Sequence, residues 1–379
     1  MFLEERGYLQ SVHDKRLFVL SDNMGVLLVQ LYGENVLYGL TNQALVQAFV
    51  KLITREFEVS MYGVLRYIQG IQIKQTDEGV SMSQNTYAKI MIEKFKLDAH
   101  EIVTTPMKIS TRLTADERGE NVNVSIYQGM IESLQYLTAS RPDICHEVNV
   151  CAEYQINPKT SHLTAVRRIL KYVNGTPTFE LYYYIKDTDN RLKGYCAADW
   201  AGSLDDIRGS LGGCYFVGNN MVPWKSKKQN SLILSTTEAE LSTLGSSSAQ
   251  LVRLKQLTEE CGMISDFPVL YCNNHRAIHC FQEPSRQPRT RHIDHQHSYI
   301  HELVKEKLIA IEHVGTKAQL ADVFIKPFMS NKFCTLRMFI GMFELKLGVS
   351  CADLEQGPEA RTGHGNPKMD RGSALSKVM

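Results

Sequence analysis

Four short apolar runs within about 50 residues, followed by a long helical pattern, constrain the fold of this chain more than any other feature. The runs cover residues 179–185, 192–197, 211–217 and 221–224. The later part of the chain adds helical patterns at 236–262, 276–281, 293–307 and 317–325, and apolar runs at 269–272 and 308–314. Early strands followed by alternating helices and strands predict an α/β (α+β) fold with a mixed sheet covered by helices on both faces.

The first 95 residues predict hairpins and helices. Residues 25–32 and 36–40 are apolar runs joined by a short polar link with glycine, which is typical of a β-hairpin. A helix is expected at 41–57, where apolar residues recur on one face. The remaining expected elements are a second hairpin made by 65–73 and 80–83 and a short helix at 83–95.

The middle of the chain has a different pattern. Residues 98–122 are polar and predict a long connection, whereas 125–173 show helical spacing interrupted by Pro142 and Pro158, which predicts three helices. Residues 352–379 are rich in glycine, proline and charge, and predict a disordered tail.

Composition narrows the function classes. Lys+Arg is 42 and Asp+Glu is 41, so the formal charge of +1 gives no global attraction to nucleic acid. The nine cysteines are an odd number without a C-x-x-C pair, which indicates free thiols in a reducing compartment. No apolar run is long enough to span a membrane. We therefore expect an intracellular protein, cytoplasmic or nuclear, that has no membrane partner.

Two short segments contain candidate catalytic acids. A hairpin tip such as Tyr32-Gly33-Glu34-Asn35 can hold two divalent ions when it carries paired carboxylates, but only Glu34 remains here. Taken alone, the segment is better explained as a plain β-turn. In Ser235-Thr236-Thr237-Glu238-Ala239-Glu240 the serine and Glu238 fit a capping box. Glu240 is left as the better candidate for a metal-facing carboxylate, with an ordinary solvent-facing acid as the alternative.

Residues 1–328 resemble the C-terminal part of a Ty1/copia-type retrotransposon Pol polyprotein, namely the latter part of the reverse transcriptase followed by ribonuclease H. The resemblance is carried by a collinear series of segments: TNQALVQAFVKLITREFEVSMYG, YIQGIQIKQTDEGVSMSQNTYAKIMIEKF, TASRPDI, SHLTAVRRILKYVNGT, ADWAG, PWKSKKQNSLILSTTEAE, RTRHID and QLADVFIKPF.

This resemblance implies a partial reverse transcriptase palm at 1–110, a helical thumb or connection region at 111–178, an RNase H-like domain at 179–328 and an extension at 329–379. The RNase H-like domain should have a five-stranded mixed sheet with three antiparallel strands first, and four acids that bind Mg²⁺ or Mn²⁺. The fingers and the third metal aspartate of the polymerase would fall before Met1.

Carried over by position, the four acids fall on Ala197, Glu240, Asn273 and Asp322, so that two of the four carboxylates are missing. The polymerase aspartate pair falls on Glu34 and Asn35. Two-metal hydrolysis needs a cluster of anionic oxygens to hold the cations together. Asp199 lies on the same face of the strand as Ala197, but about 6.6 Å further along, which is too far to substitute without remodelling. We expect no efficient hybrid cleavage.

Binding of an RNA–DNA hybrid, or of another nucleic acid, needs basic side chains rather than metal ligands. The candidates are Trp224, Lys225, Lys227, Lys228, Arg289 and Arg291. For the lysines, the alternative is a charged edge strand that prevents aggregation. The acids and histidines from His292 to His301 are expected to form a polar helix face, although a metal cluster is the alternative.

Whether the chain is an enzyme stays open at this level. The leading hypothesis is a degenerate reverse transcriptase/RNase H fragment, whose ancestral RNA-directed DNA polymerase and hybrid endoribonuclease activities are both lost. One alternative is a nucleic-acid-binding module on the RNase H-like scaffold. The other is a weakly active hybrid ribonuclease.

Overall fold

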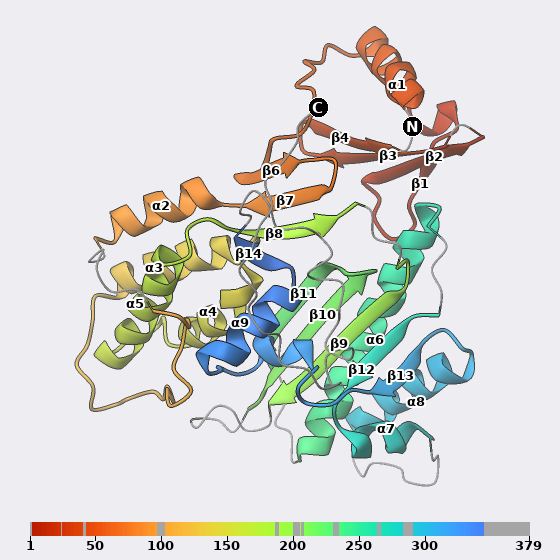
Figure 1. The fold of residues 1–379 in the computed structure, drawn as a ribbon. Coiled ribbons are helices and arrows are strands. Elements are labelled where there is room, and N and C mark those ends of the chain that lie inside the picture. Colours follow the sequence, from red (N-terminus) through yellow and green to blue (C-terminus); the bar gives the residue numbers. More distant parts are fainter. Residues whose placement is uncertain are drawn as a thin grey trace, which may run out of the picture. The chain divides into compact units, whose positions relative to one another are not determined.

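The fold is taken from a computed structural model, shown in Figure 1. The structure describes residues 2–23, 25–40, 43–96, 103–185, 189–199, 205, 208–229, 235–263, 267–282 and 291–344. The predicted tail at 352–379 lies outside these residues. In the described part of the chain, no helix combines the length and the apolar character that crossing a bilayer requires.

The N-terminal residues form a four-stranded antiparallel sheet in the order β1-β2-β3-β4. The strands are β1 (Leu9–Gln10), β2 (Leu17–Asp22), β3 (Gly25–Tyr32) and β4 (Asn35–Leu40). The same region also contains the 3₁₀ turn η1 (Glu4–Arg6) and the helix α1 (Gln43–Glu56). The predicted hairpin is confirmed, because Tyr32 pairs with Asn35 and Gly33 turns with φ +57°. Phe18, Leu27 and Phe49 are buried between this sheet and α1.

A second sheet combines strands that are far apart in the sequence, in the order β14-β8-β7-β6-β5 (Figure 1). The strands are β5 (Tyr67–Ile68), β6 (Ile71–Gln75), β7 (Gly79–Ser83), β8 (Phe179–Tyr184) and β14 (Met342–Glu344). The prediction of one strand at 65–73 is wrong, because Gln69 and Gly70 have positive φ angles and reverse the chain. The pairing of β8 with β7 and β14 was not visible in the local pattern.

The helices of the middle region share one large core. They are α2 (Asn85–Lys94), α3 (Val124–Leu137), η2 (Pro142–Ile144), α4 (Cys145–Ala152) and α5 (Thr160–Asn174), joined by α9 (Ser330–Phe339) near the C-terminus. The three predicted helices at 125–173 are confirmed. Helix α9 was missed, although Phe333 and Leu336 are fully packed into the same core as Ile131 and Ile169.

The third sheet has the order β11-β10-β9-β12-β13. Its first three strands are antiparallel, and β12 is parallel to both β9 and β13, as expected for an RNase H-like sheet. The strands are β9 (Leu192–Asp199), β10 (Ser210–Val217), β11 (Asn220–Lys228), β12 (Val269–Cys272) and β13 (Ala310–His313).

Both faces of this sheet are covered. Helix α6 packs along one face together with the two shorter helices (Figure 1). The helices are α6 (Thr236–Glu260), α7 (His275–Gln282) and α8 (Arg291–Lys305), and η3 (Leu320–Phe324) contacts β9 and β10. The predicted helix at 317–325 is instead this single 3₁₀ segment. Pro327 disfavours a helical conformation at Lys326, so the segment cannot continue.

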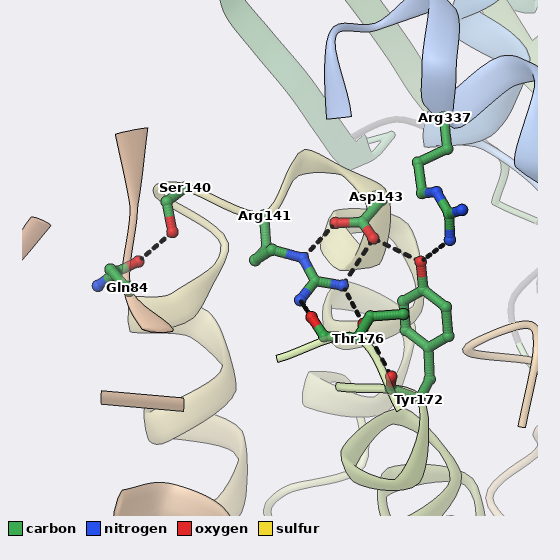
Figure 2. Close-up of polar contacts among 7 residues, drawn as sticks. All are labelled: Gln84, Ser140, Arg141, Asp143, Tyr172, Thr176 and Arg337. Carbon is green, nitrogen blue, oxygen red and sulfur yellow. Dashed lines mark hydrogen bonds and ion pairs between the residues drawn. The ribbon is translucent and has the colours of Figure 1, made fainter. Parts of the chain in front are cut away.

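A buried ion pair joins the middle helices to α9, as Figure 2 shows. Arg141 donates to both carboxylate oxygens of Asp143 at 2.8 Å, and to the carbonyl and hydroxyl of Thr176. The hydroxyl of Tyr172 donates to Asp143 at 2.6 Å and accepts from Arg337 at 2.9 Å. The TASRPDI segment therefore fixes the ends of α3 and α5 against α9.

Substituting Arg141→Met should lower the free energy of unfolding by about 3–5 kcal/mol, because the Asp143 carboxylate would stay buried without its cation. Urea unfolding measures this effect. The control is Lys255→Met, which breaks the partly exposed Lys255–Glu259 pair and should change stability by no more than about 1 kcal/mol. Equal effects of the two variants would show that the network is not needed for stability.

Candidate active site

The four positions expected to carry RNase H acids converge at the ends of two neighbouring strands and on the segments packed against them. Strands β9 and β12 pair in parallel with Tyr195 beside Tyr271. Extending this register brings Ala197 level with Asn273. Ala197 also lies opposite Gly212 of β10 and is 1% exposed. The position expected to bear the first acid is thus a packed methyl group in the core.

The last acid approaches this point from η3. A Cβ atom at Gly212 would lie 2.6 Å from the Cγ2 atom of Ile325 and 2.8 Å from the carbonyl oxygen of Ala321, so only glycine lets η3 lie this close to β10. Asp322 is fully buried there. The Nζ atom of Lys326 lies 2.8 Å from its Oδ2 atom. Burial raises the pKa of Asp322, and Lys326 opposes this effect.

Glu240 reaches the same place from α6. The hydroxyl of Ser235 accepts a hydrogen bond from the backbone N–H of Glu238, so the predicted N-cap is confirmed. Glu240 is 7% exposed, and its Oε2 atom has no hydrogen-bond partner. Burial, followed by the neighbouring Cys272, raises its pKa to about 8, while a bond from the Ala198 backbone opposes the rise. The carboxyl group is therefore largely protonated at pH 7.

Lys326 is the residue that the sequence analysis missed. Its charge acts on Asp322, Asp199 and Glu240, so one ammonium group faces the three acids of the site. Asp199 is half-buried, and burial raises its pKa as well. The sequence did contain a signal for this contact, because Lys326 follows Asp322 by four residues within the segment QLADVFIKPF.

These side chains do not fit a pair of divalent cations. Ala197 offers no oxygen, Asn273 offers a neutral one, and Lys326 already contacts Asp322. Across the residues that the structure describes, no group of three or more His, Cys, Asp or Glu side chains is arranged to hold a metal ion. The same holds for the hairpin tip, where Glu34 and Asn35 are exposed to solvent.

The four candidate nucleic-acid contacts on β11 do not share one face of the strand. On β11, Trp224 packs against the helical core and Lys228 pairs with Glu153, whereas Lys225 and Lys227 alternate with them and are exposed. Burial and Lys227 lower the pKa of Lys225. Strand β11 is at the edge of its sheet, so the charged-edge explanation also stays possible.

The second basic group, Arg289 and Arg291, lies largely outside the described residues. Arg289 lies outside the described residues, and Arg291 begins α8 with its side chain outside them. The same is true of the side chains of His292, Asp294, His295 and His297.

Comparisons with known proteins agree with this organisation. A family model described as "Reverse transcriptase (RNA-dependent DNA polymerase)" matches residues 1–109. The Retrovirus-related Pol polyprotein from transposon RE2 of Arabidopsis thaliana is 30% identical over 346 residues, which is 91% of this chain and 24% of that protein. The Pol polyprotein from transposon TNT 1-94 of Nicotiana tabacum is 29% identical over 90% of this chain and 26% of its own length. The chain thus spans about a quarter of these relatives.

Two further similarities are shorter. The Uncharacterized mitochondrial protein AtMg00810 of Arabidopsis thaliana is 30% identical over 223 residues, covering 58% of this chain and 91% of that protein. A solved structure of LC11-RNase H1 in complex with an RNA/DNA hybrid aligns with 36% of this chain and 94% of its own, at 11% identity and a TM-score of 0.28. A TM-score of this size supports no inference about fold or ligand.

The raised pKa of Glu240 predicts a pH-dependent stability. The folded state keeps a proton that the unfolded state, with a pKa near 4.5, has released, so this contribution is complete below pH 4.5 and is lost as pH rises toward 8. Glu240→Gln should therefore gain stability relative to the wild type by ~2 kcal/mol between pH 6.5 and pH 8. Urea unfolding at both pH values measures it, with Glu238→Gln in the same helical turn as control. A constant difference between Glu240→Gln and the wild type would contradict the burial argument.

Proposed function

Because the chain belongs to the Pol polyprotein family of copia-type retrotransposons, we propose that it is a reverse transcriptase/RNase H fragment in which both ancestral activities are lost. Its RNase H-like part keeps the five-stranded sheet and the helices that would position the reaction. What is lost is the charge needed to hold Mg²⁺ or Mn²⁺. The protein is then a folded scaffold without hydrolytic function.

The contact between Lys326 and Asp322 is the observation that carries this proposal. A pair of dications is stable only where anionic oxygens offset their mutual repulsion. Here one retained acid is paired with an ammonium group, a second is largely protonated at neutral pH, and position 197 has a methyl group. Lys326 therefore offsets the charge of Asp322 without a metal ion.

The hairpin tip supports the same conclusion for polymerisation. A nucleotide triphosphate and its metal ions need closely spaced carboxylates. Glu34 lies in the turn and Asn35 pairs with Tyr32 at the start of β4, so the tip offers one carboxylate on an exposed turn.

Restoring the two lost acids provides the test. The wild type should not cleave a labelled RNA–DNA hybrid with Mg²⁺ or Mn²⁺, whereas Ala197→Asp combined with Asn273→Asp should cleave it in a metal-dependent manner. The control is the same pair with Glu240→Gln, which removes one retained ligand and should abolish the gain. Wild-type turnover equal to that of the restored variant would refute the proposal.

A second function, hybrid binding without cleavage, is supported by the exposed pair Lys225 and Lys227 on the edge strand β11. Each lysine that contacts a phosphate should contribute about one unit to the slope of log affinity against log salt. The variant Lys225→Gln/Lys227→Gln should reduce that slope by about 2, as measured by fluorescence anisotropy with a labelled hybrid. Lys255→Gln on α6 is the matched control. An unchanged slope would leave the lysines with only the role of protecting the edge.

A further inference from the structure

Two histidine side chains lie face to face on the surface, at the carboxyl ends of the neighbouring parallel strands β12 and β13. The ring centroids of His275 and His313 are 3.6 Å apart, and the ring planes are inclined by 12°. Both side chains are exposed. Among the residues that the structure describes, neither ring has a hydrogen-bond or ion-pair partner. Each neutral imidazole therefore offers a ring nitrogen with a free lone pair to a ligand from solvent.

Strand pairing and a helix cap hold the two rings in place. Cys272, the last residue of β12, pairs with His313 of β13. Asn274 then caps α7, because its side-chain oxygen accepts hydrogen bonds from two backbone N–H groups of the first helical turn. His275 is the first residue of α7, and this helix also contacts β13. The rings are thus carried by regular elements, which is the arrangement that favours a precise binding site.

The spacing of the rings suits a divalent transition metal ion. In a tetrahedral zinc site each ligand nitrogen lies about 2.0–2.1 Å from the metal, which places two such nitrogens about 3.3 Å apart. The stacked rings are separated by a similar distance, with 3.6 Å between their centroids. A small opening of the stack therefore lets one nitrogen of each ring reach the same ion. Imidazole is a good ligand for Zn²⁺, Ni²⁺ and Cu²⁺.

His279 is the alternative partner for His275. It follows His275 by four residues on α7 and is exposed, and side chains with this spacing lie on one face of a helix. The stack favours His313, because its ring already lies against His275. Within the described residues, no ring contact joins His275 to His279.

We propose that His275 and His313 form a surface site for one divalent transition metal ion of the Zn²⁺, Ni²⁺ and Cu²⁺ class, with water completing its coordination. The bound ion joins the start of α7 to the end of β13. The site uses two side chains, not the group of three or more acids, cysteines and histidines that the described residues lack. None of the RNase H acid positions takes part, so the site is independent of the proposed loss of activity.

Isothermal titration calorimetry with Zn²⁺ tests the proposal, in a chelator-free chloride buffer at pH 7.5 because metal binding requires neutral imidazole rings. His275→Gln and His313→Gln should each remove the same single binding event, or weaken it by at least about tenfold. The double variant should lose no further event, because the two rings bind one ion. Cu²⁺ should bind to this site more tightly than Zn²⁺.

His301→Gln on α8 is the matched control, and it should leave this binding event unchanged whether or not other histidines of α8 bind Zn²⁺. Urea unfolding gives a second readout, because Zn²⁺ should raise the midpoint of the wild type more than that of His275→Gln or His313→Gln. Absence of Zn²⁺ binding by the wild type would overturn the proposal, as would an isotherm that His313→Gln leaves unchanged. Loss of the event in His275→Gln and His279→Gln, but not in His313→Gln, would place the ion on α7 alone and refute the role of the stack.

Discussion

A carboxylate removed from water must either have a cation beside it or give up its charge, and the buried acids of this chain show both solutions. Asp143 is held by Arg141, and Asp322 is held by Lys326. Glu147 and Glu240 each keep an oxygen without a hydrogen-bond partner, and burial raises both pKa values to about 8. The same rule therefore applies to the core of the middle region and to the candidate site.

With both activities lost, as we propose, this constraint also explains how a hydrolytic site can lose its function without unfolding its scaffold. In an intact two-metal site the acids repel one another unless cations are bound. With a methyl group at position 197 and an amide at 273, fewer charges need compensation, and Lys326 compensates the charge of Asp322. The regular register of β9 and β10, the close approach of η3 at Gly212 and the capped start of α6 are all present in this chain.

Local sequence patterns predicted those helices and strands whose formation depends on interactions between residues close together in the sequence. The hairpin at 25–40, the three helices at 125–173 and the strands of the mixed sheet follow from apolar periodicity and turn residues. The single strand predicted at 65–73 was wrong because Gln69 adopts a positive φ, which is not expected of a glutamine. The η3 segment was expected to be part of a helix at 317–325, but only five residues form a 3₁₀ turn, and all five, Asp322 included, are buried.

The site was predictable only as far as positions matched a known series of motifs. Glu240, Asp322, Ala197 and Asn273 were placed in this way, and the structure brings their strands and helices together. Lys326 was missed because its importance depends on a contact with Asp322 rather than on a pattern of its own.

The position of β8 has a consequence for the order in which the chain acquires its structure. This strand lies between β7 and β14, and its partners end at Ser83 and Glu344. During synthesis on the ribosome, the edge of β8 that faces β14 stays open until nearly all of the described chain has emerged. Late closure between distant segments is slow and leaves an unpaired edge exposed in the meantime. The nascent protein would therefore depend on chaperones more than its stable helical core suggests.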